Sequence, residues 1–445
     1  DNHYIRRTDR ELLQDKVMTS RPNGGSMATL EVIRFQQHEP HFPDLDLPET
    51  VDWVASRVAK ELPSIVWADG QTWGEANLWA HYLTEHLSTQ TVMASMKHLA
   101  SYAQWLEAEG VDWWHFPEKK SDRCLFMFRR ALVAARDAQQ IAPSTASARM
   151  AAVLRFYRWA HASSLIDPDG LKWGDREVSV KRTSSFGLER TVRVISSELR
   201  IANRKVKGGF RLEGGVFPVT EEGRRKIQAF ADMNASEELS LMLAIGFGSG
   251  LRLGSICNLK VATLEHAAID PVTGWRRIDV GPAARPPVAT KLGVNGKVPF
   301  WDDLHARALE YAASPRRLKR QAKAPPECRG LLFLNRNGYP YTQGAVTTEI
   351  CRLRAEALEA GVQVFRDFYF HRSRATFATL LMRVALKVLP VADAVDLVRE
   401  ACLHASIDTT MGYVKFIEHS KAMMESADAF SEAFLGSPKR EAPCE

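Results

Sequence analysis

The sequence of 445 residues has few of the features that mark membrane, secreted or metal-binding proteins. No window approaches the roughly 18 uninterrupted apolar residues of a membrane span, and no apolar run near residue 1 is typical of a signal peptide. The 6 cysteines are scattered, with no Cys-x-x-Cys pair and no metal-ligand spacing. This pattern favours a reducing, cytosolic setting without a structural zinc site.

The composition is otherwise ordinary, with 45% apolar and 25% charged residues, as in soluble globular proteins. The length predicts two or three domains. The net charge of +6 is modest, so its distribution is more informative than its size. Leu171–Arg211 holds 11 Lys and Arg against 4 Asp and Glu, a balance of +7 that exceeds the charge of the whole chain.

Changes in pattern along the chain predict five segments. Residues 1–49 are polar and broken by proline and glycine, which indicates an extension with at most one short helix near Asp9–Val17. Residues 50–166 are expected to be helical throughout. They include amphipathic helices over Thr91–Glu109, ended by Gly110, and Ser121–Gln139, and one that opens at Pro143-Ser144-Thr145. A basic linker (167–215), a second domain (216–419) and a C-terminal helix with a tail (420–445) follow.

The basic linker has two interpretations. It is either a solvated connector or a strap that neutralises DNA phosphates, and we favour the strap because the neighbouring segments also indicate DNA. The predicted DNA contacts are Lys181, Arg182, Arg204, Lys205 and Lys207 in the linker, and Lys97, Thr145 and Arg149 in the helical block.

The second domain is expected to mix helices with short strands. A helix over Glu237–Gly246 should end in a glycine-rich bend that presents Arg252 at the start of a new helical turn. Two strands separated by the turn at 270–274 follow, and Val288–Pro299 is typical of a hairpin with an Asn-Gly turn. Lys291 then lies near the end of that hairpin. A helix over Asp303–Ala313 and a short buried strand at 331–334 complete this part.

Polar residues recur near the C-terminus of this domain. His371 and Arg374 are three residues apart and project from one side of a predicted helix. A further helix over Val391–Leu403 leads to His404, and a turn capped by Ser406 or Asp408 presents Tyr413 nine residues later. A single His-x-x-Arg is weak evidence, and it is the ordered set that is informative.

The set Arg252, Lys291, His371, Arg374, His404 and Tyr413 lies within three motifs: Gly-Ser-Gly-Leu-Arg, His-x-x-Arg-x-x-Phe-Ala-Thr and Leu-His-Ala-Ser-Ile-x-Thr-Thr-x-x-Tyr. In this order they closely resemble the tyrosine recombinase (phage integrase) family, from roughly Gly70 to Glu418. The resemblance implies a mainly α fold with a small β-sheet. It also implies a helical core-binding (SAM-like) N-terminal domain and a mixed α/β catalytic domain that together form a C-shaped DNA clamp.

Four residues at three sites depart from the family pattern. Ser255 stands where an acidic residue usually braces the site, Cys402-Leu403 replaces Leu-Gly before the histidine, and Ala375 follows Arg374 where many members have histidine. These changes affect the positioning of the site. Every chemical group that the reaction needs is still present, so we expect an active enzyme.

The chemistry of phosphodiester cleavage agrees with the resemblance. A phenol is a weak nucleophile near neutral pH and needs cations and a base beside it. By resemblance Tyr413 is the nucleophile, Arg252 and Arg374 clamp the phosphate, and His404 donates to it. His371 assists proton transfer near the nucleophile and Lys291 is the general acid, although Lys297 on the partner strand is an alternative.

The resemblance implies a site-specific recombinase that integrates or excises a mobile element. It would act through a 3′-phosphotyrosine intermediate and a Holliday junction, with no metal, ATP or other cofactor. The implied partner is double-stranded DNA. The protein would be a homotetramer in the synaptic complex and a monomer or dimer when free, with Ser420–Leu435 docking on a neighbouring copy. The expected location is the bacterial cytoplasm, at the nucleoid and not at a membrane.

Three other functions remain open. A type IB topoisomerase shares nearly the same chemistry but needs neither sequence recognition nor synapsis. A DNA-binding regulator descended from a recombinase is a non-enzyme alternative, disfavoured by the intact Tyr413, Arg252 and Arg374. A metal-dependent nuclease is disfavoured because the sequence lacks a suitable carboxylate cluster, and sensitivity to EDTA would favour it again.

Overall fold

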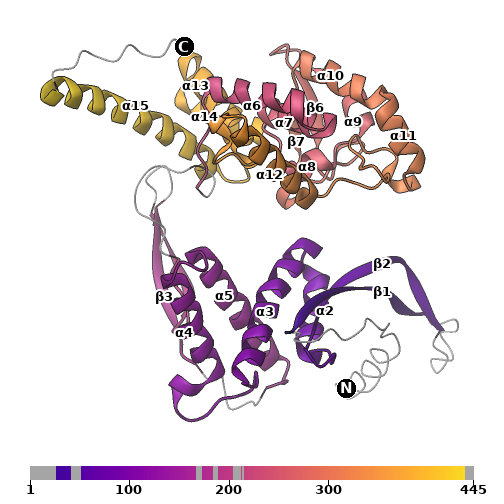
Figure 1. Ribbon diagram of the computed structural model, residues 1–445, viewed down its shortest axis with the longest axis vertical. Coiled ribbons are helices and arrows are strands. Elements are labelled where there is room, and N and C mark those ends of the chain that lie inside the picture. The colour runs from indigo at the N-terminus through magenta and orange to yellow at the C-terminus, as the bar shows by residue number, and fades with distance from the viewer. Residues whose placement is uncertain are drawn as a thin grey trace. The chain divides into compact units, whose positions relative to one another are not determined.

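The computed structural model describes residues 27–41, 52–166, 173–183, 189–203, 212 and 215–435 (Figure 1). These residues are mainly helical with three small sheets, which confirms the predicted class. The chain divides into two compact units, Asp1–Arg182 with Thr191–Lys207 and Thr183–Arg190 with Gly208–Glu445. Within the described ranges no helix is long and apolar enough to cross a membrane. The helix expected near Asp9–Val17 lies outside them.

The first unit begins with a long antiparallel hairpin of β1 (Thr29–His41) and β2 (Asp52–Val66). The strands pair from Thr29 opposite Val66 to His41 opposite Asp52, with a shift of register between Gln36 and His38. The predictions of an irregular extension up to residue 49 and of a helix from residue 50 are therefore wrong here. Hydrogen bonding between the two strands overrides the local preference of the sequence for other structure. Ala28 and Ile65 are both 0% exposed, and they fix the base of the hairpin in the core.

The described part of this unit also contains four helices, α2 (Gly74–His86), α3 (Thr89–Glu109), α4 (Cys124–Asp137) and α5 (Pro143–Ala162), and a 3₁₀ turn η1 (Lys120–Asp122). Gly110 ends α3, as predicted, and adopts the left-handed conformation with φ 63°. Pro143 is the first residue of α5, but neither Ser144 nor Thr145 caps the helix. The residue before it, Ala142, takes the N-cap position and has no capping side chain.

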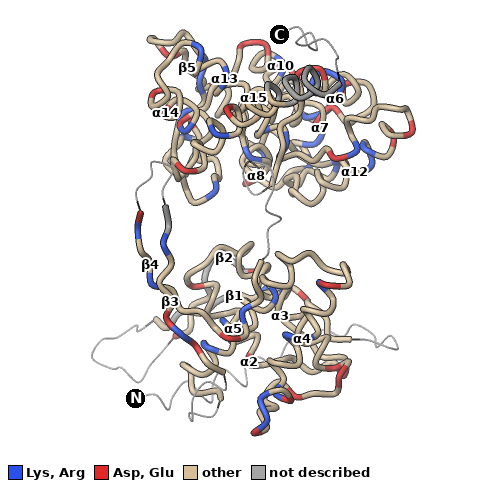
Figure 2. The backbone as a smooth tube through the Cα atoms, turned by 90° about the vertical axis from the view of Figure 1, so that its left-hand side faces the viewer, with Lys and Arg blue, Asp and Glu red and all other residues tan. Residues whose placement is uncertain are grey.

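The segment expected to be a linker contains a second two-stranded sheet, β3 (Asp175–Thr183) with β4 (Glu189–Ser197). Lys and Arg occur along both strands together with acidic residues (Figure 2). Some charges are used within the first unit, since Arg158 Nη2 donates to Asp175 Oδ2 at 2.8 Å. This ion pair uses an acidic residue of the segment, and its described cations Arg176, Lys181, Arg190, Arg193 and Arg200 are exposed.

The second unit carries most of the remaining elements. They are α6 (Glu221–Asn234), α7 (Glu237–Ser249), α8 (Leu253–Cys257), α9 (Val261–Glu265), β5 (Ala268–Ile269), β6 (Arg276–Val280), η2 (Lys291–Gly293), β7 (Gly296–Pro299), α10 (Asp302–Ala313), α11 (Pro315–Lys323), η3 (Pro326–Cys328), α12 (Gln343–Glu359), η4 (Gln363–Phe365), α13 (His371–Val388), α14 (Val391–Cys402) and α15 (Ile407–Leu435).

Helix α7 runs through the glycines that were expected to end it, and only Gly250 adopts the left-handed conformation, with φ 66°. Gly246 instead permits close packing. A Cβ there would lie 2.5 Å from Ser373 Oγ and 3.0 Å from the Phe370 ring. The glycine-rich sequence therefore lets α13 approach α7, which brings the His371 helix against the segment that presents Arg252.

The small sheet differs from the predicted Val288–Pro299 hairpin. β7 pairs with β6, with Lys297 opposite Asp279, and residues 281–295 form the connection between them. Asn295 does not form a two-residue turn with Gly296. Its side-chain Oδ1 accepts a hydrogen bond from the Ala283 N–H at 2.7 Å, so it stabilises the longer connection instead. Lys291 lies in this connection.

Two further predictions need correction. Residues 331–334 are buried as expected but form only single bridges, at Leu331 with Lys260 and at Leu334 with Pro340, and not a strand. The helix expected at Ser420–Leu435 is not a separate element, because α15 runs unbroken from Ile407 to Leu435. Tyr413 therefore lies near the start of a helix of 29 residues.

A buried carboxylate links α7 to α10 and α11. Glu238 is 0% exposed, and its Oε1 accepts hydrogen bonds from Arg316 Nε at 2.8 Å and from the Tyr311 hydroxyl at 3.0 Å. Arg320 Nη1 lies 2.7 Å from the same oxygen. Burial raises the pKa of Glu238, but the two guanidinium groups outweigh burial, so the pKa lies below its ordinary value.

Replacing Glu238 by Gln should lower the free energy of unfolding at pH 7 by about 3 kcal/mol, since it removes one partner of a buried ionic network. Because the folded pKa is depressed, this stabilisation is complete above the ordinary carboxyl value of 4.5 and is lost as the pH falls through the folded pKa. Urea denaturation at pH 7 and pH 3 measures it. An equal difference between wild type and variant at both pH values would contradict this role.

Candidate active site

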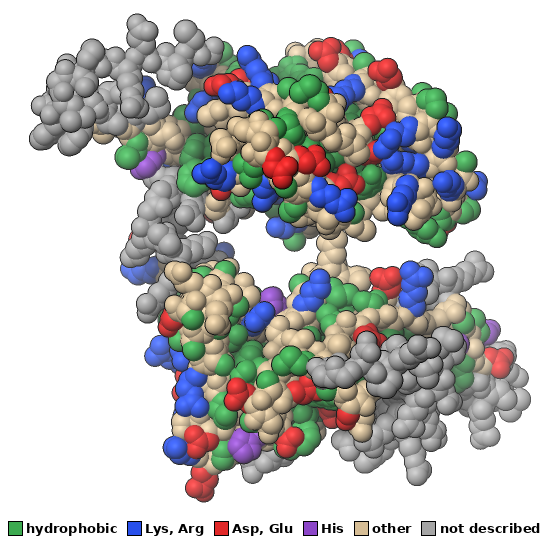
Figure 3. Space-filling model, viewed as in Figure 1, with side chains coloured by type: hydrophobic (Ala, Val, Ile, Leu, Met, Phe, Trp, Pro, Cys, Tyr) green, Lys and Arg blue, Asp and Glu red, His purple; other side chains and the backbone are tan. Residues whose placement is uncertain are grey.

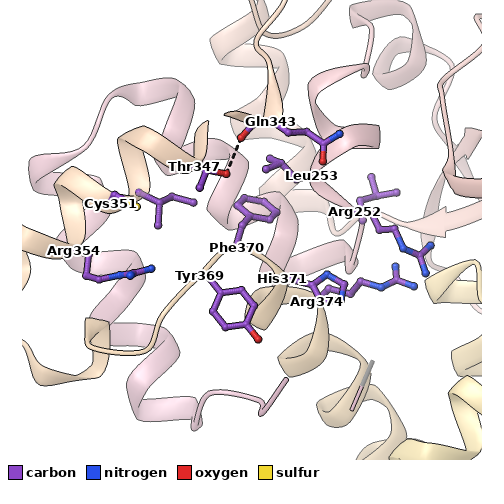
Figure 4. A pocket seen from close by; sticks show the side chains of 12 residues that line it. Arg252, Leu253, Gln343, Thr347, Cys351, Arg354, Tyr369, Phe370, His371 and Arg374 are labelled. Carbon is purple, nitrogen blue, oxygen red and sulfur yellow. Dashed lines mark hydrogen bonds between the residues drawn. The ribbon is translucent and has the colours of Figure 1, made fainter. Parts of the chain in front are cut away.

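Three of the predicted catalytic residues line one pocket of ≈ 330 Å³ in the second unit. Arg252, His371 and Arg374 lie side by side at one end of it (Figure 4). The other lining residues are Leu251, Leu253, Gln343, Thr347, Ile350, Cys351, Arg354, Tyr369 and Phe370. Segments more than 100 residues apart thus bring two guanidinium groups and an imidazole together, an arrangement suited to an anionic oxygen-rich ligand such as a phosphate.

Arg252 is positioned by the backbone on both sides of it. Gly250 ends α7, and Arg252 then takes the N-cap position of α8 with φ −72° and ψ 145°. Its carbonyl accepts hydrogen bonds from the N–H groups of Ser255 and Ile256. The half-buried side chain thus starts from a fixed point on the pocket wall. Ser255, which stands in place of the usual acidic residue, is buried and contributes this backbone contact.

Arg374 is 2% exposed and connects three segments of the unit. Its Nη1 donates to the Gly250 carbonyl and its Nη2 to the Cys402 carbonyl, each at 2.6 Å. These carbonyls hold the guanidinium in place much as a bracing carboxylate would, but without neutralising its charge. The end of α7, the start of α13 and the end of α14 are therefore fixed around one cation.

His404 and Tyr413 form the neighbouring part of the site. Helix α14 ends at Cys402, and Leu403 follows in the left-handed conformation with φ 52°. The rings of His404 and Tyr413 stack, with centroids 5.9 Å apart and an interplanar angle of 14°. Tyr413 is 0% exposed and does not line the pocket. The phenol of Tyr413 is therefore covered in this conformation of α15.

Thr410 is a site residue that sequence reasoning missed. It is 0% exposed, and its Oγ1 is hydrogen-bonded to His404 Nδ1 at 2.9 Å. This bond fixes the orientation of the imidazole ring. The only signal in the sequence was its place within the motif that ends at Tyr413.

Replacing Thr410 by Val should lower the rate of the strand cleavage proposed below about fivefold, because one orienting hydrogen bond contributes on the order of 1 kcal/mol. Thr410→Ser keeps the oxygen and should retain the wild-type rate. Single-turnover cleavage at saturating DNA separates this effect from binding. Equal rates in the Val and Ser variants would show that the bond has no role in cleavage.

Lys291 lies outside the pocket, in an exposed 3₁₀ turn of the β6–β7 connection. The base of that connection is close to the site, because a Cβ on Gly296 would lie 2.5 Å from Leu403 Cδ2. Lys297 is on the opposite face of β7 from Gly296 and from the fully buried Val298. The strand thus directs Lys297 away from the side that packs next to His404. Of the two candidates for the general acid, this favours Lys291.

The predicted DNA contacts are only partly described. Arg149 on α5 is near His98, the neighbour of Lys97 on α3. Burial, then the charges of Arg149 and Arg155, lower the pKa of His98. Lys97 is exposed, whereas Thr145 and Arg149 are half-buried. Lys181 is exposed on β3 and Arg182 is the next residue of that strand. Arg204, Lys205 and Lys207 lie outside the described residues.

Comparisons with known proteins give structural similarities only. No family model matches the sequence, and no curated protein matches it. The chain is similar to the Tn1549 transposon integrase (residues 82–397) in complex with circular intermediate DNA, with a TM-score of 0.45 and 16% identity over 76% of this chain and 94% of that one. It is also similar to a lambda integrase (75–356) dimer bound to a COC′ core site, with a TM-score of 0.45 and 13% identity over 76% of this chain and 94% of that one. The similarity to XerA recombinase has a TM-score of 0.33 and 14% identity, over 79% of this chain and 97% of that one.

Proposed function

We propose that this protein is a tyrosine-type site-specific DNA recombinase. The observation that carries the proposal is the placement of Arg252, His371 and Arg374 in one pocket, with Arg374 bonded to the Cys402 carbonyl two residues before His404. His404 in turn stacks on Tyr413. A pocket with two permanent cations beside a histidine–tyrosine pair matches the needs of phosphodiester cleavage by a phenol.

In the proposed reaction the scissile phosphate enters the pocket between Arg252 and Arg374. The Tyr413 oxygen attacks phosphorus as its proton leaves toward His371, and a bond to the 3′-phosphate forms while the bond to the 5′ oxygen breaks. Lys291 gives its proton to that oxygen, which leaves as a free 5′ hydroxyl. The 3′-phosphotyrosine keeps the phosphodiester energy, so a 5′ hydroxyl from another strand reverses the step without ATP.

The test is covalent trapping on a nicked duplex from the DNA that flanks the gene, in which the short fragment that carries the new 5′ hydroxyl diffuses away. Wild-type protein should give an SDS-stable adduct and Tyr413→Phe should give none. An adduct that persists in Tyr413→Phe would mean that another residue is the nucleophile.

Dependence on DNA sequence separates a recombinase from a type IB topoisomerase, which shares the chemistry. A recombinase should form the adduct on its own flanking site and not on scrambled duplex of the same length and composition. It should also exchange strands through a Holliday junction, and insert or remove the mobile element that carries it. Equal trapping on both duplexes, with relaxation of supercoiled plasmid, would support the topoisomerase.

We further propose that four copies assemble on two duplexes and that the distal part of α15 joins neighbouring copies. A stop codon at Ser420 keeps Tyr413 but removes the second half of that helix. This truncation should retain binding to a single site while recombination and the tetrameric complex are lost. Gel mobility and sedimentation of the complex measure the two effects, and undiminished recombination would contradict a role in assembly.

A further inference from the structure

The second unit carries a strongly basic stretch away from the pocket, at residues 315–340. It contains 7 Lys and Arg and 1 acidic residue, Glu327, so its balance of 7 − 1 = +6 equals the net charge of the chain. The cations are Arg316, Arg317, Lys319, Arg320, Lys323, Arg329 and Arg336. Lys and Arg side chains gather over the end of the unit formed by α11 (Figure 3).

Three of these cations have structural roles. Arg317 is 3% exposed and donates five hydrogen bonds, four to backbone carbonyls, including that of Leu331 at 2.8 Å, and one to the Gln321 side chain at 3.0 Å. Arg316 and Arg320 share the buried Glu238 carboxylate. Arg316 Nε also lies 3.9 Å from Glu237 Oε2. These cations hold α11 and the following loop on the core.

The other four cations, Lys319, Lys323, Arg329 and Arg336, are exposed and form what we call the α11 surface. Lys319 and Lys323 are four residues apart on one face of the helix. Arg329 and Arg336 are bound to the end of α11. Lys323 Nζ donates to the Arg336 carbonyl at 3.4 Å, and Arg329 Nε donates to the Ala324 carbonyl at 3.1 Å.

The turn that carries Arg336 is packed tightly against α11. A Cβ on Gly338 would lie 2.7 Å from the backbone of Lys323 and Ala324, and Gly338 has φ 84°, so only glycine fits there. The four exposed cations are thus fixed as one rigid patch, and Tyr339, 56% exposed, borders it.

The patch is connected to the pocket by a short length of chain. Gln343 lines the pocket and is seven residues after Arg336. Seven residues span at most about 23 Å. Duplex DNA rises about 3.4 Å per base pair. A duplex with one phosphate in the pocket would therefore extend as far as Arg336 within about seven base pairs.

We propose that the α11 surface binds backbone phosphates of the duplex that flanks the cleavage site. The proposal rests on the proposed function, because it assumes that the pocket holds a DNA phosphate. Exposed lysine and arginine side chains on a rigid patch supply charge neutralisation and not base recognition. The α11 surface therefore strengthens binding to any sequence and fixes the path of the flanking duplex.

The test compares wild type with the triple variant Lys319→Ala, Lys323→Ala and Arg336→Ala. The control triple, Arg225→Ala, Lys226→Ala and Arg366→Ala, removes three exposed cations from α6 and from the residue after η4, also in the second unit. The affinity for duplex DNA is measured between 50 and 200 mM salt, with long flanks and with flanks shorter than seven base pairs.

On long flanks the slope of log affinity against log salt should become shallower by about 2.7 in the test triple, roughly 0.9 for each lost phosphate contact. It should stay near the wild-type value in the control triple, and short flanks should abolish the difference. An unchanged slope in the test triple, or an equal change in both triples, would overturn the proposal. So would weakened binding of single-stranded RNA with unchanged binding of duplex DNA.

Trapping on the nicked substrate at low salt separates this proposal from the proposed function. The test triple should still form the Tyr413 adduct at saturating DNA, because none of its changes lies in the pocket. If wild type forms no adduct while the salt slopes differ as expected, the proposed chemistry fails and the DNA surface stands.

Discussion

Arg374→Lys should reduce the rate of strand cleavage by about 10²–10³-fold at saturating DNA, the effect of removing one preorganised transition-state donor. Lysine keeps the charge, but it has a single terminal nitrogen. It cannot bond the carbonyls of Gly250 and Cys402 and at the same time present paired donors to a phosphate. Single-turnover cleavage measures the rate, and filter binding measures the affinity separately.

Arg372→Lys is the matched control for this experiment. Arg372 is two residues earlier on α13 and also donates to backbone carbonyls, those of Phe217 and Asp367 among them, but it does not line the pocket. Both variants should lose stability, since each leaves carbonyl groups without a donor. Only Arg374→Lys should lose cleavage. An equal loss of cleavage in both variants would mean that Arg374 acts through folding alone.

Lys291→Ala should reduce cleavage of an ordinary duplex by about 10²–10⁴-fold, the contribution of a general acid, and leave binding unchanged. A substrate with a 5′-thio leaving group needs no proton, so on that substrate the variant should recover the wild-type rate. This rescue separates proton donation from a general loss of structure.

Lys297→Ala is the control, because Lys297 is also exposed and lies on the adjoining strand, six residues later. It should cleave both substrates at near the wild-type rate. The opposite result would be a defect in Lys297→Ala that the 5′-thio substrate rescues, with Lys291→Ala unaffected. That result would identify Lys297 as the general acid.

The sequence predicted helices close to α7, α10, α13 and α14 because their signals are local, whereas α6, α11 and α12 were not predicted. Gly110 was correctly predicted to end α3 in the first unit. The β1–β2 hairpin was missed because its stability comes from cross-strand pairing between segments joined through residues 42–51. Gly246 was misread for a similar reason. Its role depends on Ser373 and Phe370, more than 100 residues later, and no local pattern shows that contact.

The roles predicted for the site residues stay predictions. Arg252, His371 and Arg374 share a pocket. The hydrogen bonds from Arg374 to Gly250 and Cys402 were invisible in the sequence, because any residue supplies a backbone carbonyl. The burial of Tyr413 was equally hidden, since a tyrosine in a motif has the same letter whether it is covered or exposed.

Mapping the covalent adduct to a peptide tests the central claim most directly. After trapping on the nicked duplex, nuclease and trypsin should leave a nucleotide on the peptide 400–415, which contains Tyr413. Peptide 367–372, with the pocket tyrosine Tyr369, should remain unmodified. A nucleotide on Tyr369, or on any residue other than Tyr413, would contradict the account.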